Sequence, residues 1–269
     1  MKTNKIIMQL LVLVLTFSLS ACAANEPAPG EPKQKDSQTQ SSQQTSAGAG
    51  NTYIGYSDAD PKSKGEAKIE ISVLDGKITD VIIEEVQDGS KGHTTKNLAV
   101  YPHKPAIEGD EYFREKFTGL SSTTEIDNVD DYAGITSSST KFKLAAKRAL
   151  IKSGTKKSGT YFDGSFMGYS DPSAEKGFAT AYVTIRDDVI ESVILEEWQQ
   201  DKDKKGAFLL KDYEIYPLKE ARDANEYFTK EFVNAANSED IDAIDDFAGV
   251  TSSSASYKKA VKMALEKAI

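Results

Sequence analysis

Apolar and polar residues alternate in two stretches of the chain, residues 67–73 and 179–185. Each stretch is followed by a turn signal and by a second run rich in β-branched residues, over 78–86 and 189–198. A period of two is typical of a half-buried β-strand, and the Asp75-Gly76 pair is typical of a tight hairpin turn. The pattern therefore predicts two antiparallel hairpins, each with at least one apolar face.

Helical spacing follows each predicted hairpin. Short amphipathic stretches occupy 110–117 and 223–232, and clearer apolar stripes run through 142–150 and 257–265. Because strands come first and helices follow, the predicted fold class is α+β.

The two halves of the chain also share short sequence motifs, called words below. Gly55-Tyr56-Ser57-Asp58, Tyr101-Pro102 and Tyr112-Phe113 each recur in the second half, at an offset that drifts only from 113 to 115 residues. A period this long indicates duplicated globular domains and not a solenoid. We therefore predict two tandem repeats of a small antiparallel-sheet domain, over 52–153 and 160–269, joined by a short polar linker.

The best retained word has ten residues, Asp-Asp-Tyr-Ala-Gly-Ile-Thr-Ser-Ser-Ser at 130–139 and Asp-Asp-Phe-Ala-Gly-Val-Thr-Ser-Ser-Ser at 245–254, identical at eight positions. Its glycine permits a tight or left-handed turn. The hydroxyl residues after it lie at a predicted helix entrance, where backbone N–H groups and the helix dipole attract anions such as phosphate. The candidate site residues are Asp130, Gly134, Thr136 and Ser137, with Asp245, Gly249, Thr251 and Ser252 in the second copy.

A simpler interpretation is that Thr136, Thr251 or a following serine only caps its helix, since Ser and Thr are common N-cap residues. Capping explains the residue types. It does not explain near-verbatim retention in two diverged copies, because many other sequences cap equally well.

The N-terminus has the features of an export signal. Lys2 and Lys5 precede an apolar run over 6–19, which is too short to span a bilayer comfortably. The run ends in Leu-Ser-Ala-Cys, which resembles the lipobox of bacterial lipoproteins. We therefore predict a signal peptide over 1–21 and lipidation of Cys22, which anchors the protein to the outer face of the cell membrane.

Composition limits the remaining choices. Residues 22–51 are rich in Ser, Gln, Thr, Ala and Gly and are predicted to form a disordered tether. The net charge of −9, with mixed signs along the chain, argues against nucleic acid as a partner. One cysteine excludes an internal disulfide. His93 and His103 occur only in the first half, and we predict no metal site.

The ten-residue word resembles the flavinylation motif of the FMN-binding domain family, roughly Asp-x-x-Ser-Gly-Ala-Thr-x-Ser/Thr. The chain departs from it at Ala133 and Ile135, and at the matching Ala248 and Val250. In that family a flavin transferase takes FMN from FAD and esterifies its phosphate to the motif threonine. The resemblance implies two covalent FMN groups, on Thr136 and Thr251, with Asp130 and Asp245 as the motif aspartates.

The lipobox, the tether and the two domains together resemble the two-FMN lipoproteins of extracellular electron transfer in Gram-positive bacteria. The resemblance implies an electron carrier and not an autonomous enzyme, although the bound FMN could reduce ferric iron or other soluble acceptors. The implied partners are the flavin transferase, a membrane NADH dehydrogenase or quinone system, and extracellular electron acceptors.

Two alternatives stay open. The chain could be a non-redox lipoprotein for ligand capture or adhesion that uses the same fold without a cofactor. Residues 14–21 also resemble the apolar octapeptide pheromones that some lipoprotein leaders release, a role that would coexist with electron transfer.

Overall fold

The computed structural model describes residues 50–269, apart from 63–64, 88, 155–158 and 174–176. The predicted signal peptide, Cys22 and nearly all of the predicted tether lie outside the described residues, as does most of the predicted linker. No helix within the described part of the chain is long and apolar enough to cross a membrane.

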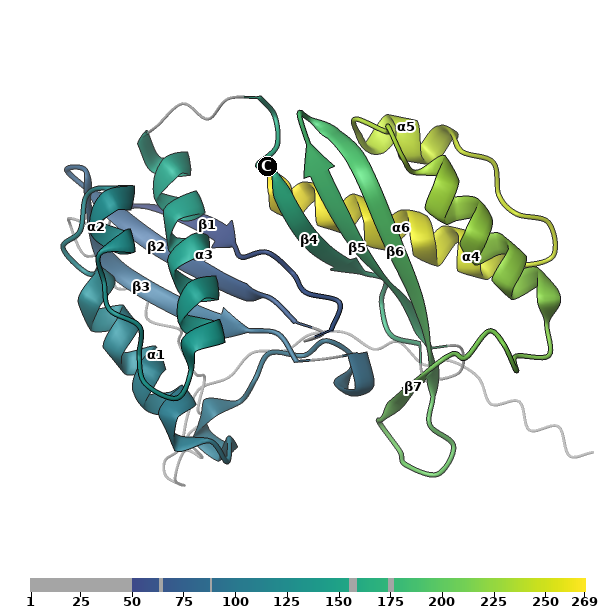
Figure 1. The fold of residues 1–269 in the computed structure, drawn as a ribbon, viewed down its shortest axis with the longest axis horizontal. Helices are drawn as coiled ribbons and strands as arrows, with labels where there is room; N and C mark the ends of the chain where they lie inside the picture. The colour runs from purple at the N-terminus through teal and green to yellow at the C-terminus, as the bar shows by residue number, and fades with distance from the viewer. Residues whose placement is uncertain (1–49, 63–64, 88, 155–158, 174–176) are drawn as a thin grey trace, which may run out of the picture. The chain divides into compact units, whose positions relative to one another are not determined.

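The first half places a three-stranded antiparallel sheet before three helices (Figure 1). Its strands, in the order β1-β2-β3, are β1 (Asn51–Tyr56), β2 (Ala67–Leu74) and β3 (Lys77–Glu85). Two short 3-10 turns follow, η1 (Gly89–Lys91) and η2 (Leu98–Val100). The helices are α1 (Lys104–Phe117), α2 (Thr123–Asp127) and α3 (Thr136–Gly154).

The second half follows the same order with one more strand. Its sheet contains β4 (Gly164–Tyr169), β5 (Phe178–Arg186), β6 (Val189–Gln200) and β7 (Phe208–Leu210), all antiparallel neighbours. Its helices are α4 (Lys219–Glu231), α5 (Ser238–Ala243) and α6 (Thr251–Ala268). The α+β fold class is thus confirmed.

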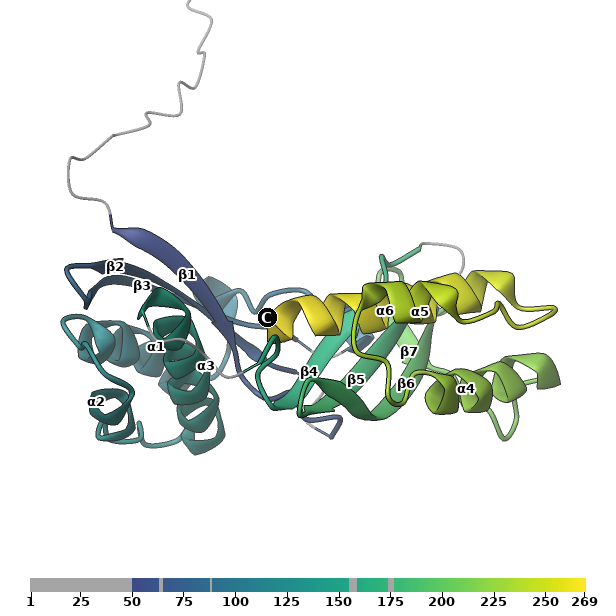
Figure 2. The ribbon, with the colours of Figure 1, turned by 90° about the horizontal axis from the view of Figure 1, so that it is seen from above.

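Each half has its own apolar core between one sheet face and its helices. Figure 2 shows α1 and α3 on the same side of the β1-β2-β3 sheet. In the first core, Ile69 and Ile71 of β2 are buried with Phe113 of α1 and Phe142 of α3. In the second, Phe228 of α4 and Tyr257 of α6 are fully buried against β5 and β6.

Both predicted hairpins are confirmed, and both turn through residues with positive φ: Asp75 and Gly76 in one, Asp187 and Asp188 in the other. Two consecutive positive φ angles match the right-handed twist of the paired strands. The short helices begin earlier than the sequence pattern indicated, at Lys104 and Lys219 and not near 110 and 223.

The first strand of each half was missed because a glycine interrupts its apolar pattern. Gly55 lies in β1 against α3, and a Cβ atom there would stand 2.1 Å from the Ala145 carbonyl oxygen. Gly168 lies in β4 against α6 in the same way, 1.9 Å from the Ala260 carbonyl oxygen. Each glycine therefore allows the long helix to pack directly on the strand backbone.

Strand β5 is buried on both faces, and its second face meets residues of the first half. Met167 and Tyr182 pack with Ala59 in a small apolar cluster. Thr180 is bonded to the ring of His93, which is itself buried. The His93 ring is therefore buried, although the residue lies outside helices and strands.

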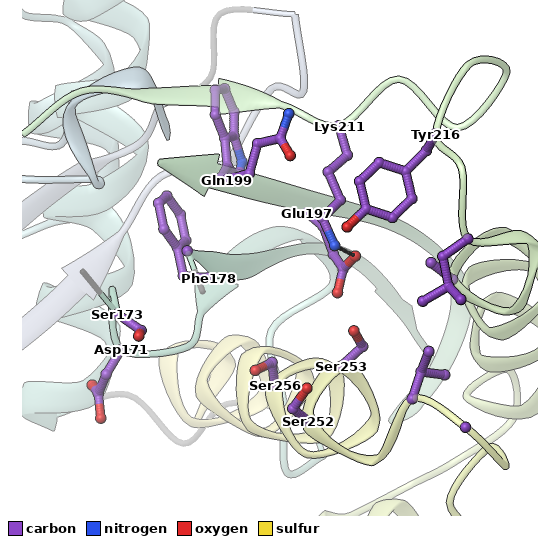
Figure 3. A pocket seen from close by; sticks show the side chains of 16 residues that line it. Asp171, Ser173, Phe178, Glu197, Gln199, Lys211, Tyr216, Ser252, Ser253 and Ser256 are labelled. Carbon is purple, nitrogen blue, oxygen red and sulfur yellow. Dashed lines mark hydrogen bonds and ion pairs between the residues drawn. The ribbon is translucent and has the colours of Figure 1, made fainter. Parts of the chain in front are cut away.

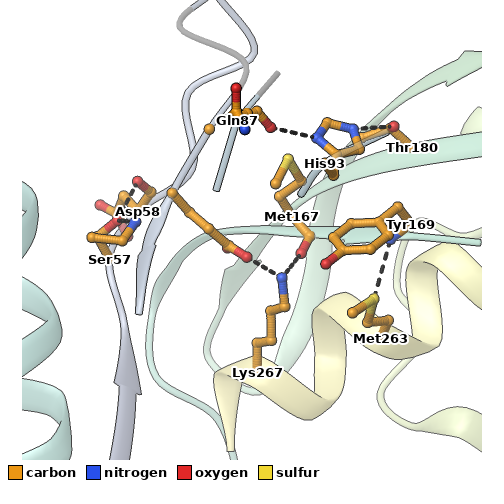
Figure 4. A network of polar contacts seen from close by, with 12 residues as sticks. Ser57, Asp58, Gln87, His93, Met167, Tyr169, Thr180, Met263 and Lys267 are labelled. Carbon is orange, nitrogen blue, oxygen red and sulfur yellow. Dashed lines mark hydrogen bonds and ion pairs between the residues drawn. The ribbon is translucent and has the colours of Figure 1, made fainter. Parts of the chain in front are cut away.

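A buried ion pair and a hydrogen bond from Arg148 also connect the halves. Glu66 and Lys267 form a fully buried pair, and the same ammonium donates to the Met167 carbonyl at 2.7 Å (Figure 4). Arg148 of α3 pairs with Asp58 at 2.7 Å and donates to the Asp163 carbonyl at 2.9 Å. Burial raises the pKa of Glu66, and the adjacent Lys267 ammonium opposes that rise.

Replacing Lys267 with Met should destabilise the protein strongly, because Glu66 would remain buried without its cation. We expect a loss of about 3–5 kcal/mol in unfolding free energy, measured by denaturant titration. The control is Lys152→Met at the matching place of α3, where the ammonium donates to the Ile54 carbonyl at 2.7 Å. An equal loss in both variants would show that the Glu66 pair adds nothing beyond that carbonyl bond.

Candidate functional site

The two ten-residue words fold into the same turn, which leads directly into the long helix of each half. Gly134 and Gly249 have φ angles of 88° and 86°, in the left-handed region that favours glycine. The residue after each glycine, Ile135 or Val250, is 6% exposed and anchors the turn in the core.

The last serine of each word fastens the turn. Ser139 Oγ accepts from the Tyr132 backbone N–H at 3.2 Å and donates to the Ile135 carbonyl at 3.0 Å. In the second half Ser254 Oγ makes the same two bonds, with Phe247 at 3.1 Å and Val250 at 3.2 Å. The glycine and this serine are therefore retained for structural reasons.

Those reasons do not extend to the threonines. Thr136 and Thr251 are the first residues of α3 and α6, and both side chains are exposed, as are Ser137 and Ser252. The N-cap of α6 is Val250, with no side-chain capping bond. The capping interpretation is therefore wrong for Thr251.

The two adjacent aspartates of each word also differ in their contacts. The second of each pair forms an ion pair with its own helix, Asp131 with Lys143 at 2.7 Å and Asp246 with Lys258 at 2.9 Å. The first of each pair, Asp130 or Asp245, is exposed beside the turn.

A cleft of about 440 Å³ opens beside the first turn of α6 in the second half (Figure 3). Ser252, Ser253 and Ser256 line it from the helix, and Lys211, Glu197 and Tyr216 lie across from them. Its remaining walls are Asp171, Ser173, Gly177, Phe178, Trp198, Gln199, Leu218, Ala221, Gly249 and Val250.

The polar wall of the cleft is held by a chain of hydrogen bonds. Lys211 pairs with Glu197 at 2.6 Å and lies 4.6 Å from the centre of the Tyr216 ring. Tyr213 donates to Glu197 at 3.2 Å, and its hydroxyl lies 2.9 Å from that of Tyr257. Burial raises the pKa of Tyr213 and of Tyr257, so both phenols stay protonated donors at neutral pH.

The first half contains a related ion pair. Lys96 pairs with Glu85 at 2.9 Å and lies 5.3 Å from the centre of the Tyr101 ring. Ser138 of α3 donates to Glu85 at 2.9 Å, and the space beside this pair is about 20 Å³. A larger hollow of about 510 Å³ lies beside Ser153 at the far end of α3 from Thr136.

Sequence reasoning missed the lysine-glutamate pairs. Their signal was a lysine five residues before each Tyr-Pro word, at Lys96 and Lys211, and a glutamate late in each return strand, at Glu85 and Glu197. Trp198 is buried at the edge of the cleft, with 6% of its surface exposed. His103 lies near the first turn, with Nε2 3.2 Å from the Gly134 carbonyl. Among the described residues, no group of three or more His, Cys, Asp or Glu side chains could hold a metal ion.

Removing the Ser254 hydroxyl should loosen the turn that positions Thr251. Ser254→Ala leaves the Phe247 N–H without its acceptor, so we expect a loss of about 1–3 kcal/mol in unfolding free energy. The exposed neighbour Ser252 provides the control, and Ser252→Ala should stay within about 0.5 kcal/mol of the parent protein. Equal stabilities of the two variants in denaturant titration would show that the Ser254 hydroxyl does not hold the turn.

Comparison with known proteins gives little further information. No protein-family model matches the chain, and no curated protein matches it either. Among solved structures, the chain is similar to the CPE2226 protein of Clostridium perfringens, with 23% identity over 39% of this chain and 88% of that chain. The TM-score of 0.31 is too low to support an argument about function.

Proposed function

We propose that the protein is a lipid-anchored electron carrier on the outer face of the cell membrane, built from two tandem copies of one domain. Each copy carries one FMN, joined by a phosphoester to Thr136 or Thr251. The observation that carries the proposal is the 440 Å³ cleft lined by Ser252 and Ser253 of α6, which follow the exposed Thr251 directly in the sequence.

The matching details of the two halves support duplication. Both have a left-handed glycine at the same place in the turn, a serine with the same two bonds, and a lysine-glutamate pair beside a tyrosine ring. Both also have a glycine where the long helix crosses the first strand. Unrelated sequences would not be expected to share four such details in the same order.

The residues of the cleft suit FMN. Its volume lies in the usual range of about 300–1,000 Å³ for small-molecule sites. Lys211 offers N–H donors for ring carbonyl oxygens, and the Ser252, Ser253 and Ser256 hydroxyls face it across the cleft. The backbone N–H groups at the start of α6 favour a phosphate at Thr251.

Attachment needs only an accessible hydroxyl on this chain. The Thr251 oxygen attacks the FMN phosphorus of FAD in the active site of a flavin transferase. The new P–O bond forms as the pyrophosphate bond breaks, AMP leaves, and the hydroxyl proton passes to a base of the transferase. Asp245 stands exposed on the same turn, where the transferase can recognise it or share a metal ion with it.

Bound FMN supplies reversible electron transfer, and the protein fixes its position and its access to solvent. Electrons arrive from a membrane NADH dehydrogenase or quinol system and leave to extracellular acceptors such as ferric iron. Covalent attachment prevents loss of the cofactor outside the cell, and the lipid on Cys22 keeps the carrier near its electron source.

Mass spectrometry of two tryptic peptides tests the proposal. The full chain is coexpressed with a flavin transferase and purified in detergent. Peptides 117–141 and 231–258 contain one motif threonine each. Each should gain the mass of FMN minus water, because each exposed threonine accepts one FMN. Thr136→Ala should abolish the first gain and Thr251→Ala the second.

Thr140→Ala is the matched control, because Thr140 is an exposed threonine one turn further along α3. That variant should keep both gains. A folded protein without either gain would refute the carrier and favour a ligand-binding or adhesion lipoprotein.

A further inference from the structure

A lysine and a glutamate meet at the same place in both halves. The Lys211 backbone N–H donates to the Glu197 carbonyl at 2.8 Å, and the Lys96 N–H donates to the Glu85 carbonyl at the same distance. Because this backbone bond sets the two residues side by side, each ammonium reaches its carboxylate, at 2.6 Å and at 2.9 Å.

Stability alone does not explain these pairs. In the second half 12% of the Lys211 side chain is exposed and 7% of the Glu197 side chain. A pair this deeply buried adds little net stability, because the loss of hydration offsets the attraction between the charges. Apolar residues of similar size would serve as well, so a lysine-glutamate pair in both halves indicates a use for the charges.

Glu197 holds the Lys211 ammonium in a fixed position. Its carboxylate accepts from that ammonium and, at 3.2 Å, from the Tyr213 hydroxyl. The Tyr213 oxygen lies 2.9 Å from that of Tyr257, a fully buried residue of α6. The position of the ammonium is therefore set by the core of the second half and not only by a flexible lysine chain.

This ammonium lies where it can meet a group attached at Thr251. Ser252 and Ser253 follow Thr251 directly and line the cleft, and Lys211 lies across from them (Figure 3). An ammonium has three N–H groups, so it can bind a negative group in the cleft while it stays paired with Glu197.

Resting on the proposed function, we propose that Lys211 stabilises the reduced state of the FMN on Thr251. Two electrons from the membrane donor and one proton at N5 leave the ring with one negative charge, shared by N1 and the C2 carbonyl oxygen. The Lys211 ammonium stabilises this charge and so raises the midpoint potential of the site. Glu197 opposes that effect, and the pair together sets the potential.

Potentials of a single-flavin protein test this role. The Thr136→Ala version of the full chain is coexpressed with a flavin transferase, and the peptide mass confirms FMN on Thr251. Its midpoint potential is then titrated at a series of pH values. Lys211→Met should lower the potential, and Glu197→Gln should raise it. The pH at which the reduced ring takes its second proton should rise by about 1 pH unit or more in Lys211→Met and fall in Glu197→Gln.

Lys219→Met is the matched control, because it removes the same charge from an exposed side chain at the start of α4. That variant should leave the potential and its pH dependence unchanged. Thermal unfolding of every variant checks the fold. A merely structural role of the pair would not move the potential in opposite directions in the two test variants.

Several results would contradict the role of Lys211. An unchanged potential in Lys211→Met and Glu197→Gln would overturn it and leave the carrier intact. An unchanged potential with a shifted phosphorus resonance in Lys211→Met would overturn it too, because the ammonium would then bind the phosphate. A shift of equal size in Lys219→Met would reduce the effect to net charge.

Two further results are kept apart from these. If Lys211→Met does not fold, Glu197→Gln decides alone, since a raised potential supports the role and an unchanged one overturns it. A folded Thr136→Ala protein without FMN on Thr251 would instead refute the proposed function at this site, and the role of Lys211 with it.

Discussion

The turn before each long helix fixes the position of one threonine. Gly134 and Gly249 reverse the chain with a left-handed residue, the next side chain is buried, and Ser139 or Ser254 closes the turn through two backbone bonds. Together these contacts determine the residue at which the helix begins. The threonine is consequently held at the first helical residue by groups other than its own hydroxyl, which leaves that hydroxyl exposed for chemistry.

The sequence predicted the elements whose signal is local. Alternation gave the hairpins β2-β3 and β5-β6, and the apolar stripe gave α3 and α6. Strands β1 and β4 were missed because their glycines are explained only by a helix packed against them. The lysine-glutamate pairs were missed for a similar reason, since Lys211 and Glu197 meet through a strand pairing that one sequence does not reveal.

The two halves have nearly the same turn but different side chains around it. The turn itself is nearly invariant because each of its bonds depends on a particular residue. The cleft of the second half is lined mostly by residues outside the repeated word, among them Glu197, Lys211 and Tyr216. The word that both halves share therefore accounts for the turn, and it says nothing about the side chains that lie across from it.

The contact between the halves contains a buried ion pair and a cluster of aromatic rings. A buried pair such as Glu66 and Lys267 adds little net stability when both partners are present, but it strongly disfavours any arrangement that separates them. The same arrangement sets His93 behind the stacked rings of Phe178 and Trp198. A change that separates the Glu66 pair should therefore disturb this aromatic cluster before it disturbs the turn that holds Thr251.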